Sequence, residues 1–252
     1  MKIKHLIWSL IIILILSILA TFFFSSFFNL KSLEFKVDDI SQDNAKVLME
    51  KANLHYGENL TLKLLKEGDI LRGRFVRAEQ YIKEDKQLKD VNVVRKDKNS
   101  ILVSYNLRKP QIALAFFDYY LYADYDGTIF MSERDLFEKA YLIKGIEIDS
   151  FYYGMDLNAC NYMFSQLSSF CENIEKYDLQ NFTATRILIQ DILLEDGRIR
   201  VYYNKNLEVI LNIDDNLDYN AYVMCEILSL IGSEERGYLD FTSSENPYFT
   251  PF

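Results

Sequence analysis

An uncharged apolar run from Leu6 to Phe28 opens the chain, and mixed apolar and polar positions follow it. As a helix this run would be roughly 34 Å long, enough to cross the hydrocarbon core of a bilayer. Bulky phenylalanines stand where a signal peptide would carry its small-residue cleavage site. Lys2 and Lys4 precede the run and favour a cytoplasmic N-terminus. The pattern predicts a cytoplasmic tail at 1–5, a transmembrane helix at 6–28 and an extracytoplasmic remainder.

The next part of the chain has the pattern of a small α+β module. Alternating positions from Leu33 to Val37 predict a strand. An apolar stripe over 45–52, with Ser41 or Asp43 as its cap, predicts a helix. We interpret the charged stretch Lys63–Arg77 as a loop. A second helix is expected over 78–86, and a hairpin over 91–107 that turns at Lys96–Asn99.

The second part of the chain is richer in strands. The segment Ile112–Phe130 predicts strands broken by the turn Asp124–Gly127, and Ser132–Asp135 resembles a capping box before a short helix. A helix is then expected over 156–170. Three strands follow: the first contains Ile187 and Ile189, the second Ile199 to Tyr203, and the third Leu207 to Ile213. A helix over 219–231 and a closing strand over Tyr238–Phe241 complete the chain pattern. These patterns predict an α+β fold with a largely antiparallel sheet.

The net charge and the small number of histidines exclude several classes of partner and of catalytic site. The formal net charge is −9, which argues against nucleic acid and anionic polymers as partners. Two histidines, His5 and His55, are too few for a Ser/His/Asp triad or a histidine-based metal site. Cys160 and Cys171 fall on one predicted helix, too far apart to bridge each other, and we interpret both as small apolar residues. We therefore expect no catalytic residues, cofactor or metal.

Three motifs then suggest a family. Val91–Arg95 and Leu107–Ala113 resemble a POTRA hairpin that runs into a basic-x-Pro-x-x-Ala junction. Tyr120–Phe130 is similar to an aromatic strand with an Asp-x-Asp-Gly turn, and Leu142–Gly145 to the apolar step that follows it. Gly237–Phe241 looks like the closing strand. The order and spacing resemble the FtsQ/DivIB family of bacterial cell-division proteins, although Val37–Ser41 lacks the glycine that usually ends the first POTRA strand.

This resemblance implies an architecture and a role. A transmembrane helix would carry a POTRA-like domain at 31–109 and a mixed α/β "β domain" at 110–252 with a C-terminal edge strand. The protein would be a non-enzymatic scaffold at the division septum. It would recruit small coiled-coil proteins of the FtsB/DivIC and FtsL type, which regulate septal peptidoglycan synthases. Strand addition is the implied binding mode. The matching residues are Tyr238, Leu239, Asp240, Phe241, Tyr248 and Phe249.

Other functions remain as alternatives. Asp124–Thr128 also matches the DxDGT signature of Mg²⁺-dependent phosphatases, in which the first aspartate is the nucleophile and the second the general acid/base. That chemistry requires the loop to follow a buried parallel strand. Asp214 and Asp215 would then supply further metal ligands, and Ser168 or Thr185 would hold the phosphate. A POTRA-type chaperone and a paired-carboxylate glycosidase are weaker alternatives, because no barrel-like series follows and no carboxylate pair is singled out.

Overall fold

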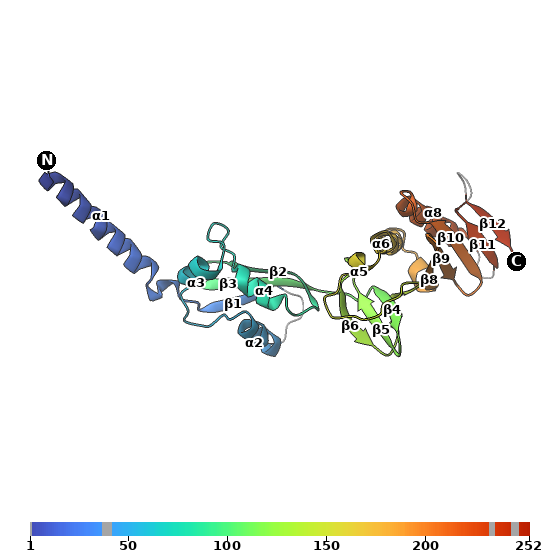
Figure 1. The fold of residues 1–252 in the computed structure, drawn as a ribbon, viewed down its shortest axis with the longest axis horizontal. Helices are drawn as coiled ribbons and strands as arrows, with labels where there is room; N and C mark the ends of the chain where they lie inside the picture. The colour runs from blue at the N-terminus through green and yellow to red at the C-terminus, as the bar shows by residue number, and fades with distance from the viewer. Residues whose placement is uncertain (1, 37–41, 232–234, 243–246) are drawn as a thin grey trace. The chain divides into compact units, whose positions relative to one another are not determined.

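The chain folds into two compact units. The computed structural model describes residues 2–36, 42–231, 235–242 and 247–252 (Figure 1). The first unit is Met1–Leu107 and the second unit is Arg108–Phe252. Val37, expected at the end of the first strand, and Ser41, a candidate helix cap, lie outside the described residues.

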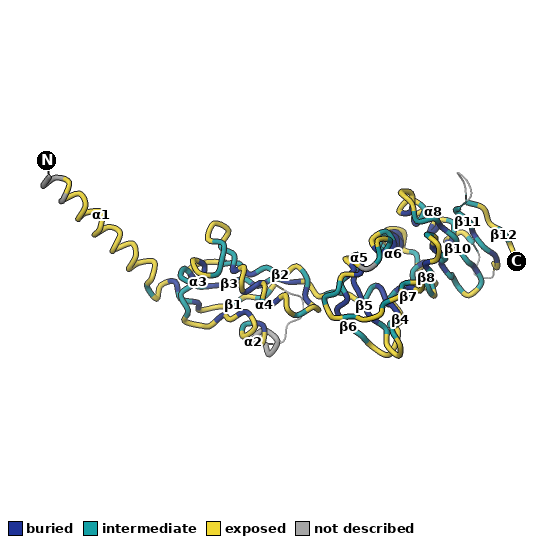
Figure 2. Tube along the Cα trace, viewed as in Figure 1, coloured by how far each residue is buried: buried dark blue, intermediate teal, exposed yellow. Residues whose placement is uncertain are grey.

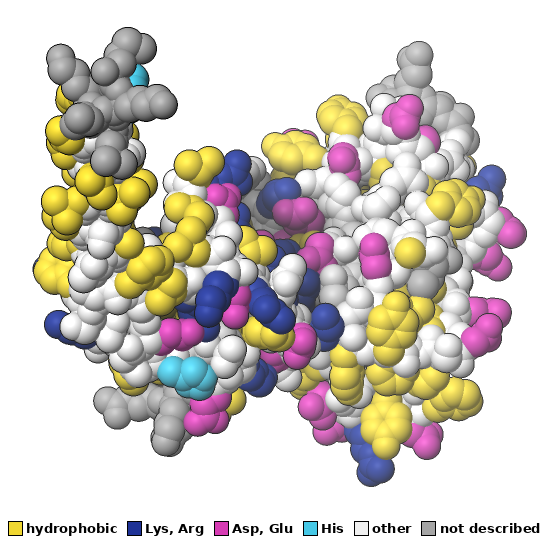
Figure 3. Space-filling model, turned by 60° about the vertical axis from the view of Figure 1, so that its left-hand side comes forward, with side chains coloured by type: hydrophobic (Ala, Val, Ile, Leu, Met, Phe, Trp, Pro, Cys, Tyr) yellow, Lys and Arg dark blue, Asp and Glu magenta, His cyan; other side chains and the backbone are white. Residues whose placement is uncertain are grey.

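The first unit begins with the apolar helix α1 (Lys2–Phe23). Among the described residues, one helical segment, Ile7–Phe28, is long and apolar enough to cross a membrane, and its surface is hydrophobic and exposed (Figures 2 and 3). The predicted helix over 6–28 is too long at its C-terminal end. The chain leaves the helix because the Ser25 hydroxyl donates to Phe22 O (2.7 Å) and accepts from Phe27 N, and a 3₁₀ turn, η1 (Ser26–Phe28), follows.

A three-stranded sheet and three helices form the rest of the first unit. The elements are β1 (Ser32–Lys36), α2 (Gln42–Lys51), α3 (Leu60–Glu67), α4 (Val76–Ile82), β2 (Leu88–Arg95) and β3 (Ser100–Leu107). The strand order is β1-β3-β2, with β1 parallel to β3 and β2 antiparallel to it. The hairpin expected around Lys96–Asn99 is therefore confirmed. Val93 and Val103 from the sheet pack with Leu60, Phe75 and Ile82 from the other side of the core.

The stretch Lys63–Arg77, expected to be a loop, is one only over 68–75, because 63–67 belong to α3 and 76–77 to α4. Asn59 caps α3, because its side-chain oxygen accepts from Thr61 N (3.0 Å) and Leu62 N (3.1 Å). The Lys63 side chain is buried and donates to Glu58 Oε1 (3.0 Å) and Asn53 O (2.6 Å). The Lys63 charge is thus paired within the fold, and Leu64 and Phe75 of the same stretch are buried in the core.

The second unit is built on a nine-stranded sheet, called the large sheet below. Its strands are β4 (Ile112–Phe116), β5 (Tyr119–Ala123), β6 (Ile129–Glu133), β7 (Tyr141–Lys144), β8 (Ile189–Glu195), β9 (Arg198–Tyr203), β10 (Leu207–Asn212), β11 (Gly237–Asp240) and β12 (Tyr248–Pro251). The order is β12-β11-β10-β9-β8-β7-β4-β5-β6. Pairing is antiparallel except at β4–β7, β7–β8 and β10–β11, so the largely antiparallel sheet is confirmed.

Helices cover one face of the large sheet. They are α5 (Leu157–Cys160), α6 (Phe164–Asn181), α7 (Thr185–Leu188) and α8 (Leu217–Leu230). The main core of this unit joins Ile192, Val201 and Val209 of the sheet to Phe170 of α6 and Met224 of α8. A smaller core lies around Tyr122 and Phe130, where Phe137 stacks on the Tyr122 ring. This part of the sheet is therefore packed on both faces.

Two helix predictions in the second unit are wrong. Ser132 lies in β6, and residues 134–140 form bends and turns rather than a helix. The Ser132 hydroxyl bonds the Tyr153 hydroxyl (2.9 Å), so it does not cap a helix. The helix expected over 156–170 is divided between α5 and α6. Asn161 is extended there (φ −141°), and its side chain accepts from Met163 N (2.9 Å).

Two residue placements change as a result. Cys160 and Cys171 lie on different helices, α5 and α6, and not on one helix face as expected. Ile187 belongs to α7 and is exposed, so it is not part of β8. Asp178 explains this short helix, because its carboxylate accepts from Thr185 N (3.1 Å) and Arg186 N (2.8 Å) and so satisfies its first donors.

Candidate functional site at the C-terminal sheet edge

The predicted edge strand, Tyr238–Phe241, is not the outermost strand. Its residues Tyr238 to Asp240 lie in β11, which pairs with β10 on one side and β12 on the other. Tyr248 and Phe249 begin β12, which forms the edge itself. The expectation of a single closing strand was therefore wrong, because the residues after Pro247 return and add one more strand. Below, "open edge" means the outer side of β12.

Asp240 links the two last strands. Its Oδ1 accepts from Thr242 N (2.6 Å) and Thr242 Oγ1 (2.7 Å), and its Oδ2 accepts from the Tyr248 hydroxyl (2.9 Å). Partial burial opposes ionisation of this carboxyl, but the hydrogen bonds outweigh it and hold the Asp240 pKa below its ordinary value. An ionised Asp240 thus stabilises the pairing of β11 with β12.

The ladder between β11 and β12 determines which backbone groups face outward. Phe252 N donates to Arg236 O (3.1 Å), while Leu239 lies opposite Phe249. Hydrogen-bonded and non-hydrogen-bonded pairs alternate in an antiparallel ladder, so the polar groups of Phe249 and Pro251 point away from β11. Proline has no N–H. The open edge therefore presents Phe249 as a donor, and Phe249 and Pro251 as acceptors.

Side chains of the last two strands divide between two faces. Leu239 is buried in the main core, and Phe249 shares its face because the two are register partners. Tyr238, Asp240 and Tyr248 lie on the opposite face. Phe241 follows β11, packs against the main core and donates its N–H to Ile210 O (2.9 Å). A strand added at the open edge would therefore lie beside Phe249 on one face of the sheet and beside Tyr248 on the other.

Gly237 allows Phe249 to pack closely at this edge. A Cβ at Gly237 would lie 2.2 Å from Thr250 O and 2.8 Å from the Phe249 ring. No side chain fits at these distances without moving β12. The sequence signal for this role is a glycine at the start of a strand, which often marks a close backbone approach.

The Asp-x-Asp-Gly turn has a structural explanation. Arg108 Nη1 lies 2.5 Å from Asp124 Oδ2 and 2.6 Å from Asp126 Oδ2. The side chains of Arg108 and Asp124 are only 13% and 3% exposed. Burial opposes ionisation of Asp126, but hydrogen bonds with Asp124, Arg108 and Thr128 hold its pKa well below its ordinary value. Arg108, expected only as part of the junction motif, is thus the cation of this turn, a role that has no local signal in the sequence.

The same turn does not have the setting that the phosphatase alternative requires. It follows β5, which is antiparallel to both of its neighbours, β4 and β6. The Ser168 hydroxyl donates to Tyr125 O (2.6 Å), and Thr185 is buried at the start of α7. The residues proposed to bind phosphate therefore have structural contacts of their own.

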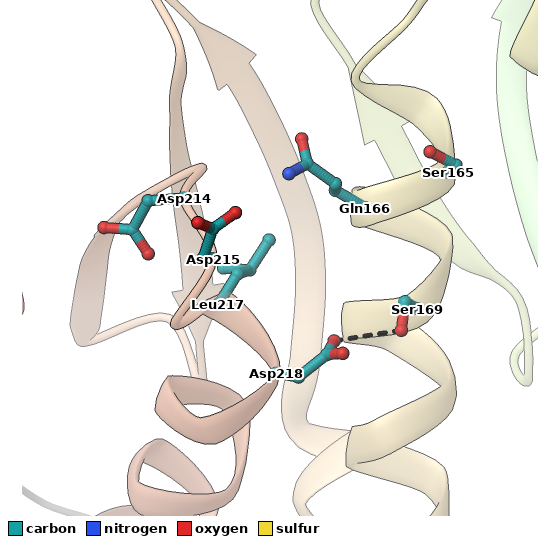
Figure 4. A pocket seen from close by; sticks show the side chains of 7 residues that line it. All are labelled: Ser165, Gln166, Ser169, Asp214, Asp215, Leu217 and Asp218. Carbon is teal, nitrogen blue, oxygen red and sulfur yellow. Dashed lines mark hydrogen bonds between the residues drawn. The ribbon is translucent and has the colours of Figure 1, made fainter.

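Asp214 and Asp215 lie elsewhere, beside an open cavity of about 300 Å³ between α6 and the start of α8. Its other lining residues are Ser165, Gln166, Ser169, Leu217 and Asp218 (Figure 4). The Ser169 hydroxyl donates to Asp218 (2.9 Å), so this contact ties the two helices together. Among the described residues, no group of three or more His, Cys, Asp or Glu could hold a metal ion.

Comparison with known proteins leaves the family resemblance untested. No protein-family model matches the chain, and no curated protein matches it either. The candidate site therefore depends on geometry, namely the open edge of β12 and the aromatic residues around it.

Proposed function

We propose that this chain is a single-pass membrane scaffold of the bacterial cell-division machinery, of the FtsQ/DivIB kind, without catalytic activity. In this proposal α1 spans the cell membrane with its N-terminus in the cytoplasm. The first unit is the POTRA-like domain and the second unit is the β domain at the division septum. The element order supports this proposal, because an apolar helix precedes a small α+β unit and a larger, mostly antiparallel sheet.

The observation that carries the proposal is the open edge of β12. Strand addition needs an outer strand with outward backbone groups and side chains that an added strand can contact. Phe249 provides an outward donor and acceptor through its backbone. Tyr248 and Phe252 are exposed, and they lie on the sheet face that also carries Tyr238 and Asp240. The partner is a small coiled-coil division protein of the FtsB/DivIC or FtsL type, which in turn recruits the septal peptidoglycan synthase complex.

Two variants of one residue can isolate backbone pairing at this edge. Phe249→Ala and Phe249→Pro both remove the ring that packs on Gly237. Only Phe249→Pro also removes the outward N–H and puts a ring carbon in its place. Because that N–H makes no bond to β11, the difference between the variants reports on an added strand.

The experiment is an affinity pull-down of the full-length protein from its own membranes, with bound proteins identified by mass spectrometry. The unmodified chain should recover a small coiled-coil membrane protein together with a septal synthase. Phe249→Ala should retain much of this recovery, and Phe249→Pro should lose most of it. Equal recovery by the two variants would rule out strand addition at β12. Recovery of neither partner by the unmodified chain would overturn the division-scaffold proposal.

A further inference from the structure

The turn between α3 and α4 exposes two apolar side chains. In this turn, Asp69–Arg74, Ile70 is 57% exposed and Leu71 is 98% exposed. Single exposed apolar residues are common on protein surfaces and need no explanation by themselves. The hydrogen bonds of the turn and its position in the first unit distinguish Ile70 and Leu71 from such isolated residues.

Hydrogen bonds within the turn satisfy most of its backbone N–H groups. Asp69 N donates to Arg74 O (2.8 Å), and Arg74 N donates to Asp69 O (3.0 Å). Inside the turn, Asp69 Oδ1 accepts from Leu71 N (3.1 Å) and Arg72 N (3.2 Å), and Gly73 N donates to Ile70 O (3.3 Å). A segment that enters a lipid environment must satisfy its backbone internally. These bonds lower the cost of moving the turn out of water, because the N–H groups of Leu71, Arg72, Gly73 and Arg74 keep acceptors within it.

Buried contacts hold the base of the turn in place. Arg95 N donates to Gly73 O (2.7 Å). The Arg74 guanidinium makes two hydrogen bonds to the buried Glu79 carboxylate (3.1 and 2.6 Å). Glu79 Oε1 also accepts from Val93 N (3.0 Å). These bonds make the turn a rigid projection of the first unit.

The end of α1 is clamped to the same part of the unit. Asn59 Nδ2 donates to Ser25 O (3.0 Å), and Asn99 Nδ2 donates to Phe27 O (2.7 Å). The Arg95 guanidinium lies 5.3 Å from the centre of the Phe28 ring. Arg95 thus contacts the turn through its backbone and the end of the apolar segment through its side chain. Figure 1 shows the turn between α3 and α4 projecting on the side toward which α1 rises.

Basic side chains lie beside the apolar residues of the turn and of the end of α1. Lys98 Nζ lies 4.1 Å from the centre of the Phe27 ring, and Arg72 is exposed next to Leu71. An apolar tip with basic neighbours suits the boundary between lipid headgroups and acyl chains, where apolar area enters the bilayer and cations meet phosphates.

We propose that Ile70 and Leu71 insert into the surface of the bilayer that α1 crosses, with Arg72 and Lys98 at the headgroup phosphates. The membrane would then hold the first unit at two points, the end of α1 and the turn, and so fix its orientation. This inference requires that α1 spans a membrane, but it does not depend on a role in cell division.

The sequence provides a direct test, because it contains a single tryptophan, Trp8. The full-length double variant Trp8→Phe/Leu71→Trp is placed in nanodiscs of phosphatidylethanolamine and phosphatidylglycerol, with and without bromine on the acyl chains. Its fluorescence should be blue-shifted, and brominated lipid should quench most of it. Trp8→Phe/Val47→Trp is the matched control, because Val47 is 50% exposed on α2 of the same unit.

Two outcomes would overturn the proposal. One is emission from the Leu71→Trp variant that matches the control, with a water-exposed maximum and no quenching by brominated lipid. The other is a blue shift in native membranes that is absent in nanodiscs of pure lipid. That result would mean that another protein, and not the bilayer, covers the turn.

Discussion

The two edges of the large sheet end differently. At β6, the chain covers the start of its own edge, because Ile129 N donates to Met155 O (2.9 Å) and Gly154 N donates to Ile129 O (2.7 Å). At β12, the outward groups of Phe249 make no hydrogen bond to any residue that the structure describes. Exposed edges invite pairing with other chains, and proteins usually protect them. The difference between the two edges is the reason why the proposed strand addition is assigned to β12.

The largest expected effect concerns the covered edge. Arg108→Ala removes the cation that bridges Asp124 and Asp126 in the turn before β6. Leaving a buried carboxylate without its cation should lower the free energy of unfolding by about 3 kcal/mol. Pulse proteolysis of the full-length protein in urea measures this change. Arg134→Ala, at an exposed position of the same unit, is the control and should change little. A loss below about 1 kcal/mol for Arg108→Ala would contradict this account of the turn.

The next effect concerns the open edge. Gly237→Val would place a side chain against Thr250 O and the Phe249 ring, so β12 should detach at a cost of about 2 kcal/mol. Hydrogen–deuterium exchange should then show loss of protection over 248–252, and partner capture should fall with it. Gly197→Ala is a control with positive φ (+73°) and no neighbour within 4 Å, so its effect should be about 1 kcal/mol and spare β12. Unchanged protection of β12 in Gly237→Val would refute the close packing.

Acid should weaken both ends of the large sheet. The pKa values of Asp126 and Asp240 are held below the ordinary value of 3.8. Their ionised forms therefore stabilise the fold above that pH, and this contribution is lost as the pH falls below about 4. Unfolding measured from pH 6 downward should show a smaller acid loss for Asp126→Asn than for the unmodified chain. An identical pH profile would mean that the Arg108 bridge does not depend on ionised Asp126.

The smallest expected effect is a gain. Pro251→Ala adds an N–H at a position of β12 that faces outward, with no loss of a bond to β11. One more hydrogen bond to an added strand should tighten partner binding about fivefold. Titration of the purified full-length protein with its partner measures this. Pro247→Ala, just before β12, should leave the affinity unchanged. Equal affinities for both variants would mean that the partner does not pair along β12.

The sequence predicts the locally determined elements well. The β2–β3 hairpin and the strands β9 and β10 show clear alternation of side chains around recognisable turns, so their positions follow from neighbouring residues. The prediction at Lys63 is wrong, because a lysine in a charged stretch is expected to be exposed to solvent. Its partners Glu58 and Asn53 become apparent only in the folded structure.

The candidate site depends more on distant pairing. Alternation identifies Tyr238 to Asp240 as a strand, but it does not show that β10 lies on one side and β12 on the other. Arg108 likewise meets Asp124 and Asp126 only because β4 and β5 fold back on each other. Such contacts are made by the topology, and a single sequence has no local pattern that reports them.

The parallel pairing of β1 with β3 has a mechanical consequence. The chain enters β1 at Ser32 from the α1 side and leaves β3 at Leu107 toward the second unit. If tension pulls the second unit away from the membrane, these two parallel strands are drawn past each other along their length. The hydrogen bonds between Ser32–Lys36 and Ser100–Ser104 then resist in shear, all together, and do not open one at a time from an end. If α1 anchors the chain and β12 binds a partner as proposed, the first unit would thus resist force between the two.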